Sequence, residues 1–413
     1  MKQIEAHTIG MGDRFAREGR AQLRAVEQAR QRGVDVFPVW NKSNREHTIV
    51  KTRPADLRAE ADDAVRSAGW TESYYVDADH IGLKTVDAFV EACDFFTLDV
   101  ADFVGKPAAD PSGFFLFAER FGGEIGIPGL DEPLQVARPD LERASGKFLR
   151  AMQEAGAIYR HLAAVKGEGT FITEVSVDET DAPQGPADLF LILAMLAMEG
   201  IPVQTIAPKF TGRFNKGVDY AGDIRAFEKE FDEDIRVLAF SVREFGLPES
   251  LKLSVHSGSD KFSLYPVINR LVKAHGCGLH VKTAGTTWLE EVIGLAEAGG
   301  DGLELAKEIY IRALGRYSEL AAPYATVIDI DPLKLPSTEA LGKWDSAAFV
   351  AALRHDPACP AYNPNLRQLL HVAFKVAAEM GPVYLDALER YREVIERNVT
   401  HNLLDRHILP IFS

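Results

Sequence analysis

Short runs of β-type residues alternate with helical segments along the first two thirds of the chain. Eight such runs occur, at His7–Gly10, Val34–Trp40, Tyr74–Asp79, Phe95–Val100, Thr170–Val177, Ile201–Ala207, Leu251–Ser257 and Leu279–Thr283. Between most of them lie amphipathic segments, such as Arg20–Arg32, Thr85–Cys93 and Ala187–Glu199. Strands that alternate with helices pair in parallel through right-handed crossovers, and eight such units close a barrel. The sequence therefore predicts an α/β protein with a TIM-type (β/α)8 barrel over residues 1–290.

Two regions exceed a minimal barrel. Residues 102–140 are rich in Pro and Gly, but four phenylalanines make them too apolar for a disordered linker: Phe114, Phe115, Phe117 and Phe121. We expect an ordered insertion after the fourth strand. Residues 291–413 are predicted to form a helical extension that packs on the barrel as part of a single structural unit. One late helix begins at Asn363-Pro364, a favourable N-cap followed by Pro at the first helical position, and runs to about Glu379.

Composition excludes several function classes. The 413 residues carry a net charge of −15, which repels polyanions, so we expect no nucleic-acid partner. We find no signal-peptide pattern and no apolar run of the roughly 20 residues that a spanning helix needs, so we expect no membrane partner. The three cysteines, Cys93, Cys277 and Cys359, lie far apart and indicate reduced thiols in a cytoplasmic protein. The sequence leaves a homo-oligomer open.

Reactive side chains lie in the last two predicted strands. His256 lies next to the end of the first of them, which leads into a loop that begins at Gly258. His280 and Lys282 belong to the second, which leads into a loop that contains Gly285. In a βα barrel, reactive residues at the carboxyl ends of strands, followed by Gly-containing loops, mark the catalytic face. From the end of the first strand and the loop that follows it we include Ser257, Asp260 and Lys261 among the candidate substrate-binding residues. The alternative is that His256, His280 and Lys282 are each an ordinary strand-end residue that faces solvent.

Two other strands contain carboxylates on one face. Asp77 and Asp79 share a face, with His80 just beyond, and this combination suits a divalent metal or a general acid–base pair. Glu174 faces the same way as Ser176 and Asp178 in an otherwise apolar run, where an unpaired carboxylate would be costly to bury. Glu174 therefore needs a metal or a cationic partner. The alternative for the Asp77, Asp79 and His80 set is a helix N-cap Asp with a surface His. The alternative for Glu174 is a purely structural salt bridge.

Together these strands offer a candidate metal site. His80, Glu174, His256 and His280 form a nitrogen and oxygen ligand set that suits Zn²⁺, Mn²⁺ or Co²⁺. No short ligand spacing supports the set, which rests on all four residues lying at or near strand ends. His280 is its weakest member, because it stands near the start of its strand.

Basic residues cluster after the sixth predicted strand. Lys209, Arg213 and Lys216 lie close together in sequence, which is what an anionic substrate would need in an acidic protein. With Gln204 from the preceding strand, Lys209 and Arg213 are candidate substrate-binding residues, although a solvated loop would look the same. In the late helix, Arg367, His371 and Lys375 recur on one face. This stripe either lines the mouth of the active site, with His371 as a substrate contact, or faces solvent.

Several of these segments resemble one known family. The segments VDADH (76–80), VHSGSDKF (255–262), HVKTAGT (280–286), LRQLLH (366–371) and RHILPIF (406–412) are similar to those of the tagaturonate epimerase family of barrel enzymes. The resemblance spans nearly the whole chain. It implies that the protein interconverts D-tagaturonate and D-fructuronate, both keto-uronates, with a divalent cation. The four-residue ligand set is read from the residues and not from the resemblance.

The chemistry of these substrates indicates a mechanism. The two keto-acids differ at a carbon one bond beyond the position α to the ketone, so the carbonyl does not acidify its hydrogen. A retro-aldol cleavage can instead break the bond between that carbon and the α carbon, leaving an enediolate and an aldehyde that rotates before the bond re-forms. We expect a divalent cation to stabilise the enediolate. Asp79, Glu174 and Lys282 are the candidate catalytic residues, with Asp79 as the base. Lys282 also joins Lys209 and Arg213 as a candidate for holding the substrate carboxylate.

Two other function classes remain open at this stage. Lys282-Thr283-Ala284-Gly285 is similar to the Schiff-base lysine segment of deoxyribose-phosphate-type aldolases, which suggests an aldolase or a ketose isomerase on the same barrel. A catalytically silent protein that binds a sugar acid is the alternative from another class.

Overall fold

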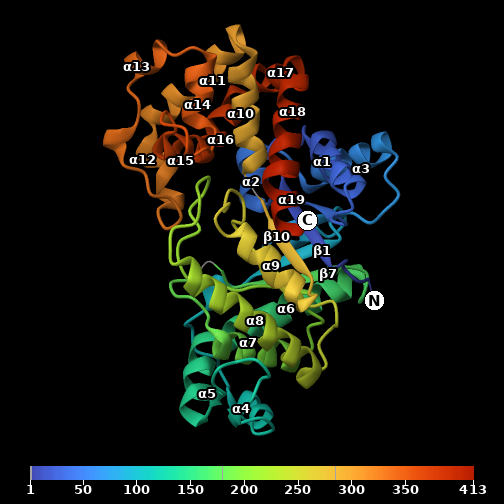
Figure 1. The fold of residues 1–413 in the computed structure, drawn as a ribbon. Helices are drawn as coiled ribbons and strands as arrows, with labels where there is room; N and C mark the ends of the chain where they lie inside the picture. The colour runs from blue at the N-terminus through green and yellow to red at the C-terminus, as the bar shows by residue number, and fades with distance from the viewer. Residues whose placement is uncertain (1, 179, 284) are drawn as a thin grey trace.

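Eight parallel strands close a barrel. The computed structural model describes residues 2–178, 180–283 and 285–413, and its barrel strands follow the order β1-β10-β9-β8-β7-β4-β3-β2 (Figure 1). Their bounds are β1 His7–Gly12, β2 Phe37–Ser43, β3 Tyr75–Ile81, β4 Phe95–Asp99, β7 Ile172–Ser176, β8 Thr205–Ala207, β9 Lys252–Val255 and β10 Leu279–Lys282. Each overlaps one of the predicted runs. The predicted TIM-type barrel is confirmed.

The inside of the barrel changes character along its axis. Near the amino ends of the strands, a small apolar cluster fills the interior, formed by Ile4, Val39, Tyr75, Phe95 and Ile172. Nearer the carboxyl ends the buried side chains are polar, and Asp77, Glu174 and Lys282 are all at most 2% exposed. Buried charges persist only when other groups pair with them. The barrel interior is therefore apolar near the amino ends of its strands and charged nearer their carboxyl ends.

Helices surround most of the barrel. They are α1 Gly19–Gln31, α2 Asn44–Val50, α3 Pro54–Ala68, α6 Arg150–Lys166, α7 Pro186–Met198, α8 Ile224–Phe245, α9 Tyr265–His275 and α10 Thr286–Ala298. The helix expected within Thr85–Cys93 is wrong, because the structure has only a 3-10 turn there, Val86–Ala88. The Thr85 hydroxyl group bonds both the N–H and the carbonyl group of Gly82. A local turn of this kind competes with helix formation.

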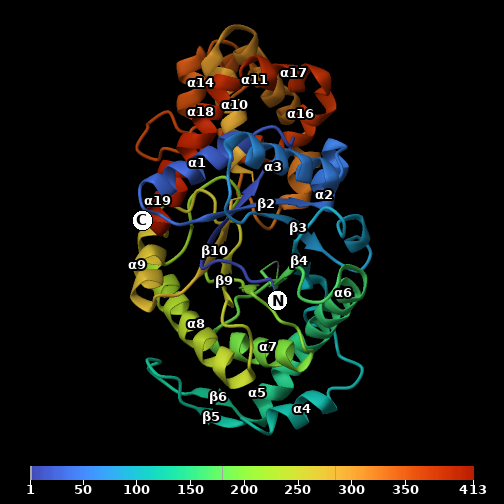
Figure 2. The same cartoon turned by 90° about the vertical axis from the view of Figure 1, so that its right-hand side faces the viewer.

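The predicted insertion is ordered and covers α7. It contains α4 Ser112–Ala118, β5 Gly123–Ile125, β6 Leu134–Val136 and α5 Arg138–Ala144, which lie below α7 and α8 in Figure 2. The ring of Phe121 lies 5.5 Å from that of Phe190 on α7 and 5.3 Å from that of Phe245 on α8. This second layer explains why α7 is apolar on all sides, since eight consecutive residues from Leu189 to Leu196 are buried.

The predicted helical extension forms a second lobe and also completes the barrel. Its helices are α11 Gly300–Gly315, α12 Tyr317–Ala321, α13 Thr338–Gly342, α14 Ser346–Leu353, α15 Pro364–Val372, α16 Phe374–Met380, α17 Pro382–Arg390, α18 Arg392–Leu403 and α19 Leu409–Phe412. In Figure 1 α18 and α19 run from the upper lobe down the side of the barrel. Thr400 on α18 donates a hydrogen bond to the Ala21 carbonyl group of α1 (3.0 Å), and Asn269 on α9 donates to the Ile411 carbonyl group of α19 (2.9 Å).

Details of the late helix differ from expectation at one point. The side chain of Asn363 accepts hydrogen bonds from the N–H groups of Asn365 and Leu366, so the predicted N-cap is confirmed. The helix does not run unbroken to Glu379, because Ala373 leaves helical geometry and separates α15 from α16. None of the described helices is long and apolar enough to cross a bilayer. Cys93, Cys277 and Cys359 are free thiols.

The buried Glu290 predicts a specific pH dependence of stability. Glu290 on α10 accepts a hydrogen bond from Asn402 on α18 (2.8 Å), and burial raises the pKa of Glu290 from 4.5 to about 7. Between these two pH values the native state keeps a proton on Glu290 that the unfolded chain has lost. The contribution of protonated Glu290 to the free energy of unfolding is therefore fully present below pH 4.5, and it is lost as the pH rises through about 7. Glu290→Gln should therefore raise the free energy of unfolding at about pH 8 by up to about 3 kcal/mol, with little gain at about pH 4. Urea denaturation at both pH values measures this difference, and an equal effect at both would contradict the assignment.

Candidate active site

A cavity of about 740 Å³ opens at the carboxyl ends of the barrel strands. Its lining comes from the ends of β2, β3 and β10, from the loops that follow β1, β7, β8 and β9, and from the extension, which contributes residues 323–327 and His371. A second cavity, of about 690 Å³, lies at the other end of the barrel beside α8 and α9 and has a mostly apolar lining. Barrel enzymes carry their chemistry at the carboxyl ends of the strands. The titratable side chains of the first cavity therefore mark the candidate site.

An irregularity in β3 directs two neighbouring residues into this cavity. Successive side chains of a regular strand point to opposite faces. The pairing of β3 with β4 shifts register between Ala78 and Ile81, and His80 has a left-handed backbone (φ 52°). Such bulges re-aim side chains. As a result, Asp79 and His80 both line the cavity, with the His80 Nδ1 2.9 Å from an Asp79 carboxylate oxygen.

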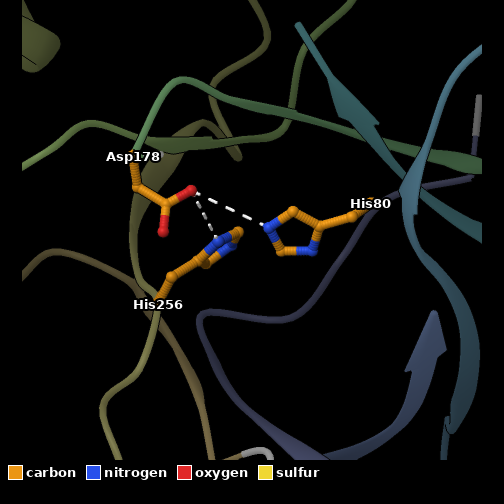
Figure 3. Close-up of side chains that lie close together, drawn as sticks. All are labelled: His80, Asp178 and His256. Atoms are coloured by element: carbon orange, nitrogen blue, oxygen red, sulfur yellow. Dashed lines mark ion pairs between the residues drawn. The ribbon is translucent and has the colours of Figure 1, made fainter. Parts of the chain in front are cut away.

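Three side chains from different strands converge on one point. His80 from β3, Asp178 just after β7 and His256 just after β9 each offer a ligand atom, all within 4.8 Å of one another (Figure 3). One oxygen of Asp178 lies 3.3 Å from the His256 Nδ1 and 3.8 Å from the His80 Nε2. Within the described part of the chain, both of these ring nitrogens are buried without a hydrogen-bond partner. These three side chains could therefore hold a metal ion.

A carboxylate stands behind each imidazole. Asp79 bonds the far nitrogen of His80, and Glu174 bonds the His256 Nε2 at 2.7 Å. Metal-binding histidines typically bond a carboxylate in this way, because the bond fixes the tautomer and the ring orientation. Glu174, which was predicted as a ligand, thus lies behind the cluster, and Asp178 takes the third position. The sequence analysis had placed Asp178 on the correct face but not among the ligands.

His280, the fourth predicted ligand, lies outside the cluster. Its Nδ1 is 2.8 Å from the Thr8 hydroxyl group, and its ring packs 5.4 Å from that of Phe95 inside the barrel. Burial lowers the pKa of His280 to about 3, so the ring is neutral. His280 lies away from the cluster because it is the second residue of β10, whereas the cavity begins at the carboxyl end of that strand, at Lys282.

Lys282 is surrounded by carboxylates. Its ammonium nitrogen lies 2.8 Å from oxygens of Asp77, Asp79 and Glu174, and it also donates to the Thr97 hydroxyl group at 2.6 Å. Gly10 makes room for this side chain, because a Cβ atom there would lie 2.9 Å from the Lys282 Cγ. Lys282 therefore crosses the barrel interior and holds three acidic residues together.

These charges shift each other's protonation. Burial alone would lower the pKa of Lys282, but Asp77, Asp79 and Glu174 raise it well above its usual value. Burial raises the pKa of Asp77 to about 7. For Asp79, burial is outweighed by His80 and Lys282, which hold its pKa well below the usual range. The resting site thus presents an ionised Asp79 beside a protonated Lys282.

Lys282 is consequently a poor candidate for Schiff-base chemistry, which needs a neutral amine. We expect that borohydride added during turnover will trap no substrate adduct on Lys282, as measured by mass spectrometry of the intact chain and its peptides. A mass increase that maps to Lys282 would restore the aldolase alternative.

The remaining predicted substrate residues divide into two groups. Lys209, Arg213, Ser257 and His371 line the cavity. Gln204 does not, because its amide group bonds the backbone of Lys2 and Ile4 at the amino end of the barrel. Asp260 pairs with Arg367 at 2.8 Å, and the Lys261 ammonium group donates to three backbone carbonyl groups, of Asn215, Val218 and Ser259. Both are buried supports of the loop after β9.

The stripe on the late helix does not face solvent as a whole. Arg367 is fully buried and His371 is 2% exposed, whereas Lys375 forms an ion pair with Glu319 at the surface. Sequence reasoning also missed Arg14 and Asn41, which line the cavity. Asn41 is 1% exposed, and neither end of its amide group has a hydrogen-bond partner. The sequence could have indicated Asn41, because β2 continues through the polar residues Asn41-Lys42-Ser43. The predicted strand ended at Trp40 and so left these residues out.

Comparison with known proteins identifies the family. A family model described as tagaturonate epimerase matches residues 1–113 and 121–402. The chain belongs to this family. It is therefore an isomerase of the epimerase type. The tagaturonate/fructuronate epimerase of Thermotoga maritima is 30% identical over 408 residues, which span 95% of this chain and 76% of that protein.

Solved structures agree with the fold of this epimerase. The native crystal structure of a fructuronate-tagaturonate epimerase from Cohnella laeviribosi superposes with a TM-score of 0.83 at 24% identity, covering 100% of this chain and 82% of that one. A complex of the same protein with two glycerol molecules gives a TM-score of 0.82 at 23% identity, covering 100% of this chain and 83% of that one. The barrel and the helical extension therefore belong to one shared architecture.

Proposed function

We propose that this epimerase interconverts D-tagaturonate and D-fructuronate with the help of a divalent metal ion, through retro-aldol chemistry. Family membership and the name of the Thermotoga maritima relative support the substrate. One observation in the structure supports a metal ion at this site. Two buried imidazole nitrogens, which have no hydrogen-bond partner among the described residues, face the same Asp178 oxygen. Each of the two rings is backed by a carboxylate.

The side chains present fit a divalent cation. His80, Asp178 and His256 would hold it, as three protein ligands that leave further positions for substrate, the arrangement typical of catalytic sites. The charges agree, since four carboxylates (Asp77, Asp79, Glu174 and Asp178) surround one lysine and two histidines. Zn²⁺, Mn²⁺ and Co²⁺ all accept this ligand set. When bound, the cation would supply a Lewis acid for the ketone and its neighbouring hydroxyl group.

Asp79 is the proposed base. It lines the cavity as an ionised carboxylate and so can accept the proton of the hydroxyl group on the carbon to be inverted. The bond between that carbon and the α carbon then breaks, and its electron pair passes into the enediolate, leaving an aldehyde. The aldehyde rotates, the enediolate attacks its other face, and Asp79 returns the proton. Lys282 keeps Asp79 ionised and brings a positive charge to the same cavity.

Metal dependence can be tested by removal and by substitution. Exhaustive EDTA treatment should abolish epimerisation, and Mn²⁺, Co²⁺ or Zn²⁺ should restore it. His256→Ala and Asp178→Asn should each lose metal in elemental analysis while keeping a cooperative thermal transition. His275→Ala, which removes a histidine that pairs with Asp232 outside the site, is the matched control and should keep its metal. Full activity of the metal-free protein would end this part of the proposal.

The fate of one hydrogen separates retro-aldol chemistry from proton exchange. In a retro-aldol reaction the hydrogen on the inverted carbon stays attached and becomes the aldehyde hydrogen. We therefore expect no deuterium at that carbon after turnover in D₂O, as read by NMR. Stoichiometric incorporation there would instead show deprotonation and reprotonation of the carbon.

The same mechanism predicts the effect of removing the base. Asp79→Asn keeps the shape of the side chain but cannot accept the proton, so kcat should fall about 10²–10⁴-fold with metal still bound. Steady-state kinetics together with elemental analysis tests this. Unchanged kcat would assign the base to another group.

A further inference from the structure

The wall of the cavity formed partly by the extension is basic. Arg14 from the loop after β1, Lys216 from the loop after β8 and His371 from α15 all line it. His371 is 2% exposed, and neither of its ring nitrogens has a hydrogen-bond partner among the residues that the structure describes. The Arg14 Nε is likewise buried without a partner. Buried polar atoms are nearly always satisfied in folded proteins, so unsatisfied ones inside a cavity indicate a ligand.

His371 and Arg14 converge on the beginning of α10. Gly285 stands at the N-cap of this helix, and a Cβ atom there would lie 2.3 Å from the His371 Nε2 and 3.2 Å from an Arg14 Nη atom. On the other side of the ring, a Cβ atom at Gly217 would lie 3.3 Å from the His371 Cδ2. The N-terminus of a helix attracts anions through its free N–H groups and its dipole. Barrel enzymes frequently bind phosphate groups with the loops that follow the seventh and eighth strands.

Lys216 adds a positive charge with no acidic partner. Its ammonium group donates to the Ser257 hydroxyl group at 2.7 Å, and within residues 2–178, 180–283 and 285–413 it forms no ion pair. The other candidate cations are engaged elsewhere: Lys282 with three carboxylates, Arg213 with Asp329 at the exposed rim, and Lys209 with the Thr180 carbonyl group. Arg14 pairs with Glu46 through one Nη atom only.

We infer that Lys216, Arg14 and His371, together with the N-terminus of α10, form the subsite that binds the carboxylate of the substrate. This inference rests on the proposed function, because it assumes a keto-uronate as the ligand. Ser257, which accepts the hydrogen bond from Lys216, follows His256 directly in the chain. The basic subsite and the His80–Asp178–His256 cluster therefore belong to one continuous cavity, with room for the two ends of one six-carbon acid.

The subsite also has a role in the reaction. Breaking the bond to the α carbon leaves a three-carbon enediolate and a three-carbon aldehyde that carries the carboxylate. A carboxylate held by Lys216 and His371 keeps the aldehyde fragment in the cavity. Rotation about the bond between the aldehyde carbon and its neighbour then exposes the other face without releasing the fragment. Lys216 and His371 are thus positioning residues for the inversion as well as determinants of specificity.

The test compares an acid substrate with its neutral analogue. A charge-assisted hydrogen bond contributes enough that Lys216→Met should lower kcat/KM for D-tagaturonate about 10–150-fold, while kcat/KM for the neutral ketohexose D-tagatose changes less than about threefold. Lys216→Arg should recover most of the loss. His371→Asn should likewise lower kcat/KM for D-tagaturonate relative to kcat/KM for D-tagatose. Lys343→Met removes one exposed lysine of the extension and is the control for net charge, with no change expected.

A second readout distinguishes positioning from a merely structural role. If the carboxylate anchors the aldehyde fragment, more turnovers of Lys216→Met should end in release, with protonation of the enediolate giving dihydroxyacetone. This product is measured by NMR or a coupled assay and should rise relative to epimerised acid. An unchanged kcat/KM ratio between acid and neutral substrates in both Lys216→Met and His371→Asn would overturn the subsite and favour Lys209 in its place.

Calorimetry separates failure of the subsite from failure of the proposed function. Binding of D-gluconate compared with D-glucitol requires no turnover, and the preference for the acid should fall about 10–150-fold in Lys216→Met. If the unmodified protein does not epimerise keto-uronates but shows this loss, the proposed function falls and the anion subsite stands. If it epimerises them and Lys216→Met keeps the full preference, only the subsite falls.

Discussion

The ion cluster around Lys282 is the interaction on which the site depends. One ammonium group inside a closed barrel is held by Asp77, Asp79 and Glu174. Burying this many charges is tolerable only because each finds partners, and removal of any one would leave the others uncompensated. Two of the same carboxylates also position histidines of the cavity, because Glu174 bonds His256 and Asp79 bonds His80. The charges that stabilise the barrel interior and the carboxylates that orient the cavity histidines therefore belong to one network.

A second constraint joins the two lobes. Asp260, in the loop after β9, pairs with the fully buried Arg367 on α15, and Arg367 also donates to the carbonyl groups of Gly217 and Leu353. This contact fixes the extension over the loops after β8 and β9. Its consequence is that His371, one turn further along α15, reaches the cavity. Asp260 and Arg367 thus support the loops and the helix around the cavity without lining it themselves.

Sequence reasoning succeeded where the signal is local and failed where contacts cross the barrel. His80 and His256 were predicted to lie together because each stands at or near a strand end, and their side chains do converge in the cavity. Asp178 was left out because it lies two positions beyond the end of β7, so its position relative to the other strands was not evident from the sequence. Glu174 needed a partner, as burial demanded, but nothing local indicated that the partner would be Lys282 and His256. Gln204 was misplaced because Thr205 begins a very short strand, which leaves Gln204 at the amino end of the barrel.

The sequence by itself determined the alternation of strands and helices, the ordered insertion and the family, because periodicity, turn residues and motif segments are local properties of the chain. Tertiary structure alone decided which side chains meet. The bulge at His80, the register of eight strands and the closure of the barrel bring His80, Asp178 and His256 within reach of one ion. Packing of the extension brings His371 beside Arg14 at the start of α10. The physical reason is that barrel closure and lobe packing are collective results of many weak contacts, so no single segment encodes the distances across the cavity.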